Sequence, residues 1–253
     1  MIYREFLAGV LAPLIVVSAL LFAWRHRTTR ANWTGRFVLM GLLAVLAVCY
    51  TAPWDGWIIR NSVWSYPPDS IWGTIADVPI EEYLFMIGQT LFVGFWTLTV
   101  LPTTPMRAPS ASRSWRRPVY SALWLTAALI GGVAAALDTN ALYLGSMLVW
   151  FGPPLALQAA VGADLLWAAR RRRLAALSIT VVLWFADLFA IRSGTWQISS
   201  AHTSGVMLFG LPIEEALFFL VTTMLITNSF VLLSFSTTRS RLRLRRQYDH
   251  STL

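Results

Sequence analysis

The chain has 253 residues, of which 57% are hydrophobic and only 13% are charged, and its formal net charge is +8. Soluble domains carry roughly twice that fraction of charged residues, so the composition excludes an ordinary soluble protein. All 20 basic residues are arginines and they do not form one patch, so the positive charge is not that of a nucleic-acid-binding protein. With a single cysteine, Cys49, no intrachain disulfide can form.

Long apolar segments predict the secondary structure, because about 20 apolar residues in a helix span the hydrocarbon core of a bilayer. Seven such segments occur, at about 3–24, 36–53, 79–101, 118–137, 141–168, 174–191 and 211–236. The sequence therefore predicts an all-α, polytopic integral membrane protein with about seven transmembrane helices. The first apolar run is too long for a signal peptide, and arginines follow it, so we expect it to remain as an anchor.

The arginines predict the orientation of these helices. Clusters of arginine follow the first, third, fifth and seventh segments, whereas only Arg4, Arg60 and Arg192 fall on the opposite side. Because cytoplasmic loops are rich in basic residues, the N-terminus is expected outside and the C-terminus in the cytoplasm of a cell that carries the protein in its plasma membrane. The basic segment after residue 239 is expected to face anionic lipid.

A Pro-x-Glu-Glu element opens the third and the seventh segments. It occurs first as Pro79-Ile80-Glu81-Glu82 and again, 133 residues later, as Pro212-Ile213-Glu214-Glu215. Three upstream residues recur at an offset of 132, namely Asp55, Arg60 and Trp64 as Asp187, Arg192 and Trp196. Two adjacent carboxylates at the start of a membrane helix are costly, so their duplication indicates a shared function.

The duplication also predicts the domain organisation. The expected parts are a first repeat at 1–101, a connector with the fourth span at 102–140, a second repeat at 141–238 and a basic cytoplasmic tail at 239–253. Three spans and one connector bring the second repeat into the membrane in the same orientation as the first. Both Pro-x-Glu-Glu elements are therefore expected at the outer side of the bilayer.

Proline and glutamate in a first turn are also features of an ordinary helix start. An aromatic residue one turn later favours a functional site, since Phe85 follows Glu81 and Phe218 follows Glu214 by four residues. Gln89 continues the face of Glu82 along the helix, and its counterpart is Thr222.

A carboxyl group with a like-charged neighbour in a low-dielectric site tends to keep its proton. Such an acid can protonate an apolar substrate, and aromatic faces stabilise the resulting cation. Trp64 and Trp196 recur and are expected at the site, whereas the other aromatic residues of these connections are expected at the membrane interface. These others are Trp54, Trp57, Tyr66, Trp72 and Phe189.

Arg60 and Arg192 each follow an aspartate by five residues. Each is expected either to form an ion pair with that aspartate, tying the loop to the helix end, or to assist the glutamates. Tyr83 has Ala216 as its counterpart, so the two repeats are not chemically identical.

Two stretches carry a resemblance to a known family. "TAPWDGWIIRNSVWSYPPDSIWGTIADVPIEEYLFM" and "FADLFAIRSGTWQIS…LFGLPIEEALFFL" resemble the two halves of the membrane-integral, flavin-independent lycopene cyclases. The chain resembles the fused form of the two-subunit bacterial cyclase. The resemblance implies ring closure at the ψ end of an acyclic carotenoid such as lycopene, by protonation, cyclisation of the cation and deprotonation, without net redox change.

The resemblance implies that the four glutamates, Glu81, Glu82, Glu214 and Glu215, are catalytic. It implies supporting or substrate-binding roles for Asp55, Arg60, Trp64, Asp187, Arg192 and Trp196, to which the spacing adds Phe85 and Phe218. The expected partners are the carotenoid, the lipid bilayer and other carotenoid biosynthetic enzymes, with no nucleic acid.

No cofactor or metal is expected, because the chain has no Gly-x-Gly-x-x-Gly motif and its histidines, His26, His202 and His250, are scattered. The main alternative is a membrane transporter with paired intramembrane carboxylates, although such proteins usually break helices near the midplane. A retinal-binding protein is excluded, because the chain lacks the lysine that its Schiff base requires. A membrane prenyltransferase is disfavoured because the aspartates are dispersed. A non-catalytic carotenoid-binding subunit would not need both glutamate pairs. The ring type, the number of rings, the substrate length, the acid and base assignments, the choice between one composite site and two, and the oligomeric state stay open.

Overall fold

The structure, a computed structural model, describes residues 1–29, 31, 33–67, 69–108 and 114–235. Within these residues, seven helical segments are long and apolar enough to cross a membrane, which confirms the predicted all-α polytopic fold. The predicted basic tail at 239–253 lies outside the described residues.

The first span consists of three consecutive helical pieces, α1 (Tyr3–Phe6), the π-helical η1 (Leu7–Leu11) and α2 (Ala12–His26). The sixth span is divided into α7 (Arg170–Leu177) and α8 (Thr180–Arg192), and two short 3₁₀ turns, η2 (Thr139–Ala141) and η3 (Ser200–His202), lie outside the long helices. The other spans are single helices, α3 (Thr34–Arg60), α4 (Ile80–Val100), α5 (Arg116–Leu137), α6 (Leu142–Ala168) and α9 (Ile213–Leu233).

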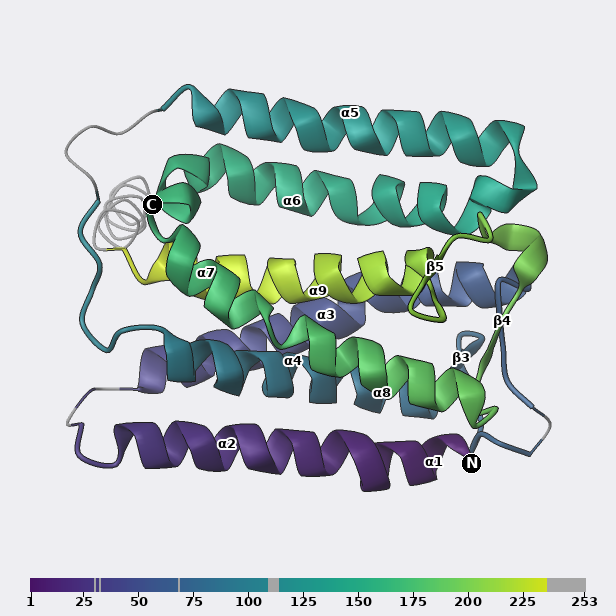
Figure 1. Ribbon diagram of the computed structural model, residues 1–253, viewed down its shortest axis with the longest axis horizontal. Coiled ribbons are helices and arrows are strands. Elements are labelled where there is room, and N and C mark those ends of the chain that lie inside the picture. The colour runs from purple at the N-terminus through teal and green to yellow at the C-terminus, as the bar shows by residue number, and fades with distance from the viewer. Residues whose placement is uncertain (30, 32, 68, 109–113, 236–253) are drawn as a thin grey trace, which may run out of the picture.

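The helices run roughly parallel to one another, and α4 and α9 form the centre of the bundle (Figure 1). Helix α4 contacts α2 and α3, whereas α9 contacts α6, α7 and α8, and the two central helices contact each other. Gln89 Nε2 donates to Thr222 Oγ1 at 2.8 Å across this central contact. These two residues, predicted as counterparts, therefore meet at the boundary between the two repeats.

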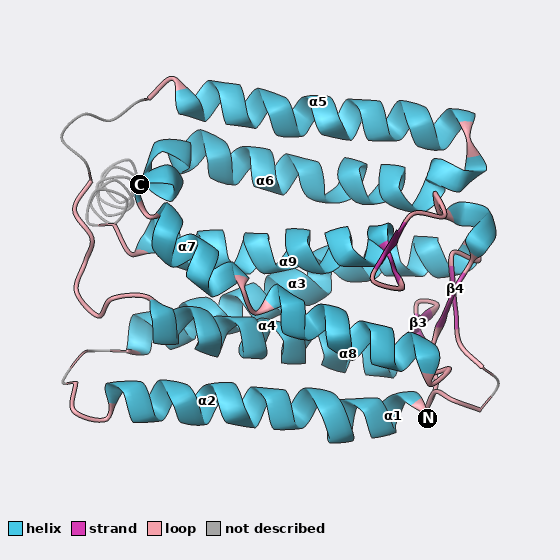
Figure 2. Ribbon diagram, in the orientation of Figure 1, coloured by secondary structure: helices cyan, strands magenta, loops and turns pink. Residues whose placement is uncertain are grey.

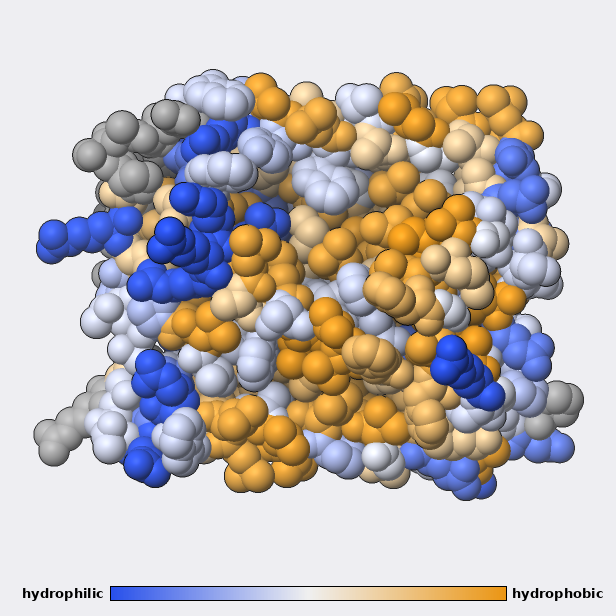
Figure 3. Space-filling model, viewed as in Figure 1, coloured by the Kyte–Doolittle hydropathy of each residue, from blue (hydrophilic) through white to orange (hydrophobic). Residues whose placement is uncertain are grey.

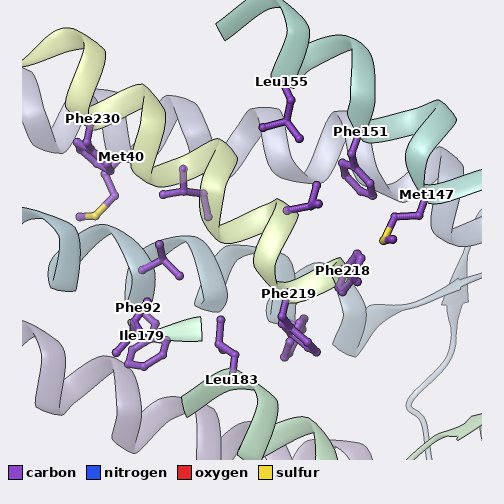
Figure 4. Close-up of a cluster of buried hydrophobic side chains, with 14 of the residues drawn as sticks. Met40, Phe92, Met147, Phe151, Leu155, Ile179, Leu183, Phe218, Phe219 and Phe230 are labelled. Carbon is purple, nitrogen blue, oxygen red and sulfur yellow. The ribbon is translucent and has the colours of Figure 1, made fainter. Parts of the chain in front are cut away.

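The hydrophobic core surrounds α4 and α9. Figure 4 shows Phe218 and Phe219 on α9, with Phe151 from α6 and Leu183 from α8 close by. The outer faces of the helices are apolar as well, and the surface between the two ends of the bundle is largely hydrophobic (Figure 3). Leu20, Leu42 and Leu129, for example, are each more than 60% exposed, as expected of side chains that face lipid.

The short strands gather at one end of the bundle, the end at which α4 and α9 begin (Figure 2). The hairpin of β2 (Thr74–Ile75) and β3 (Val78–Pro79) leads into α4, and that of β5 (Met207–Leu208) and β6 (Leu211–Pro212) leads into α9. Both hairpins turn through two residues with positive φ, Ala76–Asp77 and Phe209–Gly210. This is the geometry of a two-residue type I′ turn, whose twist matches that of the strands.

A third pairing joins the two repeats. Strand β1 (Trp64–Ser65) pairs with β4 (Gln197–Ile198) in antiparallel orientation, with Trp64 opposite Ile198. Both Pro-x-Glu-Glu elements therefore lie at the same end of the bundle, beneath loops that are joined to each other (Figure 1).

The predicted end of the second span at residue 53 was wrong, because α3 continues to Arg60 with Pro53 inside it. Trp54, Asp55 and Trp57 are therefore helical rather than part of a loop. Proline is tolerated inside membrane helices because neighbouring helices satisfy the backbone groups that it frees.

The connector helix α5 packs almost entirely on α6 through small residues. A Cβ atom on Gly145 would collide with the carbonyl oxygen of Gly131, so the two backbones are in direct contact there. Small residues permit this close approach of membrane helices. Arg117 of α5 also forms a two-point ion pair with the buried Asp164 of α6, at 2.7 and 3.1 Å.

Gly145→Ala is expected to destabilise the α5–α6 pair, because the added methyl group overlaps the α5 backbone, which cannot move aside as a flexible side chain can. We expect the free energy of unfolding to fall by about 1–3 kcal/mol, measured as a lower melting temperature in detergent. Gly41→Ala is the matched control, since no atom lies within 4 Å of its added Cβ. Equal melting temperatures for the two variants would contradict the close packing at Gly145.

Candidate active site

A small cavity of about 20 Å³ lies between the two repeats at the strand-bearing end of the bundle. We call it the central cavity. Acidic and aromatic side chains from both repeats line it, namely Tyr3, Trp64, Tyr66, Glu82, Phe85, Asp187, Trp196, Glu215, Phe218 and Phe219. One cavity thus contains the second glutamate of each Pro-x-Glu-Glu element.

Glu82 is held in this cavity by tyrosine. The hydroxyl of Tyr66 donates to Glu82 Oε1 at 2.6 Å, and the ring of Tyr3 stacks on that of Tyr66 at 5.9 Å. Burial, together with the negative charge of Glu82, raises the pKa of Tyr66 well above its ordinary value. Tyr66 therefore keeps its proton and remains a hydrogen-bond donor to the carboxylate.

Glu215 is held by donors from both repeats. Tyr143 Oη donates to Glu215 Oε1 at 2.7 Å, and Trp64 Nε1 donates to the same oxygen at 3.1 Å. The recurring tryptophan of the first repeat thus binds the acid of the second repeat. Its counterpart Trp196 instead donates to Asp187 Oδ1, within its own repeat, at 3.0 Å. The duplicated sequence therefore builds a site that is not symmetric.

Glu81 and Glu214 lie outside the central cavity although they are fully buried. Glu81 Oε1 accepts from the backbone N–H of Trp72 at 2.7 Å. Glu214 Oε1 accepts from the backbone N–H and the hydroxyl of Ser204, at 2.7 and 2.6 Å. Adjacent residues point about 100° apart around a helix. The first glutamate of each element therefore faces the preceding loop, and the second faces the cavity.

The predicted ion pair between Arg60 and Asp55 was wrong, because Arg60 Nη1 pairs with Asp77 at 2.8 Å and both of those side chains are more than half exposed. Five residues along a helix correspond to about 140° of rotation. Asp55 consequently points inward and is buried, whereas Arg60 points outward. Asp187 and Arg192 have the same spacing on α8, and there Asp187 lines the cavity while Arg192 is exposed.

The division of the aromatic residues between the site and the membrane interface differs in part from the prediction. Trp64, Trp196, Phe85 and Phe218 all line the central cavity, as the sequence indicated. Two residues predicted at the membrane interface are instead internal, since Trp54 is 2% exposed and Tyr66 lines the cavity. Trp54 is internal because it belongs to helix α3, where its side chain packs in the core, and not to a loop. The remaining three, Trp57, Trp72 and Phe189, are exposed, which agrees with an interfacial position.

Two residues that line the cavity, Tyr3 and Phe219, and one that binds Glu215, Tyr143, were not found from the sequence. Tyr3 and Tyr143 occupy equivalent positions at the starts of the first and fifth spans, 140 residues apart, and this second offset was a usable signal. Phe219 has Met86 as its counterpart, so the repeat gave no indication of it. Within the described ranges, no group of three or more metal-binding side chains occurs.

The geometry of the central cavity and the fold together define a class of protein. It is an integral membrane protein with a buried, aromatic-lined acid site between two related halves. The sequence model of one family, described as lycopene cyclase, matches residues 5–100 and 139–233. The chain belongs to the lycopene cyclase family, and this confirms the resemblance noted in the sequence.

Named relatives agree with this assignment. The chain is 38% identical over 244 residues to lycopene beta-cyclase of Halobacterium salinarum, which covers 94% of this chain and 98% of that protein. It is 34% identical over 206 residues to the bifunctional lycopene cyclase/phytoene synthase of Sporisorium reilianum, covering 74% of this chain and 29% of that protein. The bifunctional protein of the same name from Gibberella fujikuroi is 35% identical over 202 residues, covering 77% of this chain and 34% of that protein. No solved structure matches the chain. The protein is therefore an enzyme of carotenoid biosynthesis, a carotenoid cyclase.

Proposed function

We propose that this cyclase closes ionone-type rings at the ψ ends of lycopene or a related acyclic carotenoid, with Glu82 and Glu215 as its acid–base pair. The observation that carries the proposal is the central cavity, which brings one buried carboxylate from each repeat together among aromatic rings. The name of the Halobacterium relative supports a β-type ring as the product.

The reaction needs one proton donor and one proton acceptor. One glutamate in its protonated form transfers a proton to a carbon of the terminal double bond, which leaves a tertiary carbocation. The neighbouring alkene supplies an electron pair to the cation, and the new carbon–carbon bond closes the ring. The other glutamate, as a carboxylate, removes a proton from the ring cation, so the product is an isomer of the substrate.

The walls of the central cavity suit the cationic intermediate. Aromatic faces attract a positive charge, and Phe85 lies 6.3 Å from Trp196 and 6.0 Å from Phe219, measured between ring centroids. Phe218 and Trp64 form a second such pair at 5.7 Å. Exclusion of water by these rings prevents capture of the cation as an alcohol.

Six further predicted site residues are proposed to support this pair, and of these only Asp187 lines the central cavity. Glu81 and Glu214 are proposed as positioning residues that fix the loops preceding α4 and α9. Asp187 lines the cavity with Glu215, and Asp55 is buried, so both are proposed to help position the acid–base pair. Arg60 and Arg192 are proposed to act at the surface of the loops only.

We further propose two parallel repeats, 1–101 and 141–238, joined by the connector 102–140. The two separate stretches matched by the family model support this division.

We also propose that the protein lies in the plasma membrane with its N-terminus outside the cell and its C-terminus in the cytoplasm. This orientation puts the central cavity near the outer side of the membrane. The arginine-rich connections support it, since they lie at the end of the bundle opposite the strands (Figure 1). The fusion of cyclase and phytoene synthase in the fungal relatives supports an association with other carotenoid enzymes.

The function is tested by expressing the protein in a bacterial host that accumulates lycopene, without added flavin or nicotinamide cofactor. We expect cyclic carotenoid, separated by chromatography and identified by its absorption spectrum and its unchanged mass. The double variant Glu82→Gln/Glu215→Gln, expressed to the same level in the membrane, is the control and should leave lycopene unchanged. Unchanged lycopene with membrane-inserted wild-type protein would contradict the proposal and favour the transporter alternative.

A further inference from the structure

A second, narrower pocket adjoins the central cavity, and the half-buried residues Val10, Leu14 and Ala186 border it. It is too narrow in this structure to admit a water molecule, and it shares Phe85, Asp187 and Phe219 with the central cavity. Its remaining walls are aliphatic and aromatic, formed by Phe6, Val10, Leu11 and Leu14 of the first span and by Leu183 and Ala186 of α8. We call the boundary between these two spans the open seam.

The two helices beside the open seam are held by other partners rather than by each other. The first span packs mainly on α4, and α8 packs mainly on α9. Trp184 Nε1 of α8, for example, donates to the Ala216 carbonyl oxygen of α9 at 2.8 Å. The hydrogen bond that crosses the boundary lies at its polar end, where the N-terminal amine of Met1 donates to the Ser193 carbonyl oxygen at 3.1 Å. Among the described residues, no hydrogen bond joins α8 to the apolar length of the first span.

The internal repeat provides an equivalent boundary between α3 and α6, which we call the closed seam. Tyr50 Oη donates to the Trp150 carbonyl oxygen at 2.6 Å, and Trp150 Nε1 donates to the Tyr50 carbonyl oxygen at 2.9 Å. The Trp54 ring also fills this boundary, stacked on Phe218 at 5.7 Å and in edge contact with Phe151 at 5.2 Å. Two reciprocal hydrogen bonds and large rings therefore hold α3 against α6.

The same positions in the open seam carry small or aliphatic residues. At the offset of 132, Tyr50 corresponds to Val182 and Trp54 to Ala186. At the offset of 140, Trp150 corresponds to Val10 and Phe151 to Leu11. None of these four replacements can form a side-chain hydrogen bond across the boundary. The two repeats thus form two equivalent helix boundaries, and only the closed seam has large rings and side-chain hydrogen bonds at these positions.

From this asymmetry we propose that the acyclic carotenoid enters the central cavity from the bilayer through the open seam, and that its polyene chain lies between Val10 and Ala186 during catalysis. The inference rests on the proposed function, because it takes a ψ-end polyene as the substrate. The occupant follows from the chemistry of the path, which has an apolar wall, lies between two helices with lipid-exposed faces and ends at the central cavity that contains the two glutamates. A polyene dissolved in the membrane matches all three properties, whereas a water-soluble ligand would have to cross lipid-facing surface.

The test replaces Ala186 by tryptophan, the residue at the equivalent position of the closed seam. We expect Ala186→Trp to lower the conversion of lycopene at least tenfold, at equal amounts of membrane-inserted protein. Phe185→Trp is the matched control, since Phe185 lies next to Ala186 on the same helix and is 67% exposed, and it should leave the conversion unchanged. A fully active Ala186→Trp variant beside an active wild type would overturn the open seam while leaving the proposed function intact.

A second measurement tests whether the carotenoid occupies the open seam, even if Ala186→Trp fails to fold. A diazirine-bearing amino acid placed at Val10 should, on irradiation in lycopene-containing membranes, form a covalent carotenoid adduct at least fivefold more often than the same group at Val17. Val17 lies on the same span and is 53% exposed. Equal adduct yields at the two positions, in a preparation that still converts lycopene, would refute the path. Failure of the wild type to convert lycopene would instead refute the proposed function.

Discussion

Glu82→Gln and Glu215→Gln are each expected to abolish most of the cyclase activity, with a loss of about 10²–10⁴-fold. Glutamine keeps the size of the side chain, and its oxygen still accepts from Tyr66 in one case and from Tyr143 in the other. It neither donates nor accepts the proton that ring closure requires. Because the two carboxylates occupy one cavity, either substitution alone should suffice. Conversion of lycopene by membranes with matched protein content measures the effect.

Asp77→Asn is the control for loss of a carboxylate at the same end of the bundle. Asp77 lies in the hairpin before α4 and its side chain is 59% exposed, paired with Arg60. Exposed ion pairs contribute about 0–1 kcal/mol, so this variant should retain nearly full activity. Retention of more than a tenth of the activity by either cavity variant would contradict the acid–base assignment. If each single variant still closed one end of lycopene, the two glutamates would belong to separate sites.

Substitution of the first glutamate of each element, Glu81 or Glu214, should have a different effect from substitution of the second. Removal of the carboxylate in Glu81→Ala leaves the N–H of Trp72 without its acceptor, and Glu214→Ala leaves two donors of Ser204 without theirs. A hydrogen bond to a charged group contributes about 1.5–3 kcal/mol, so we expect a loss of stability of that size. Activity should fall as well, because the loop before α4 carries Tyr66.

Glutamine should rescue this defect in large part, because its side-chain oxygen can accept the same backbone hydrogen bond. We therefore expect Glu81→Gln and Glu214→Gln to keep most of the activity and of the melting temperature that the alanine variants lose. Thermal unfolding in detergent and conversion of lycopene, measured on the same preparations, separate the two effects. Inactivity of Glu81→Gln at an unchanged melting temperature would show that Glu81 transfers a proton itself.

Several features of the fold follow from local properties of the chain. Apolar length alone predicts the seven spans, because a helix that crosses lipid must satisfy every backbone group internally. Repetition at fixed offsets predicts that Trp64, Trp196 and the glutamates have a functional role, but it leaves open whether they form one site or two. The end of α3 was predicted wrongly because proline breaks helices in water, whereas here neighbouring helices hold the segment from Trp54 to Arg60 in place.

The site itself depended on rotations and contacts that no local pattern contains. Glu81 and Glu82 are equivalent in the sequence, and only the packing of α4 turns the second of them into the cavity. Trp64 and Trp196 occupy matching positions, yet in the folded protein they have different carboxylate partners, Glu215 and Asp187.

The sequence by itself determined that this protein is a membrane-embedded cyclase with a duplicated acidic element, because composition, spacing and family motif are properties of the chain alone. Only the tertiary structure decided that the two elements share one cavity, which glutamate of each faces it, and that one of two equivalent helix boundaries is closed by aromatic residues. These outcomes depend on contacts between residues more than 90 positions apart, such as Tyr50 with Trp150, and such contacts arise only when the helices pack.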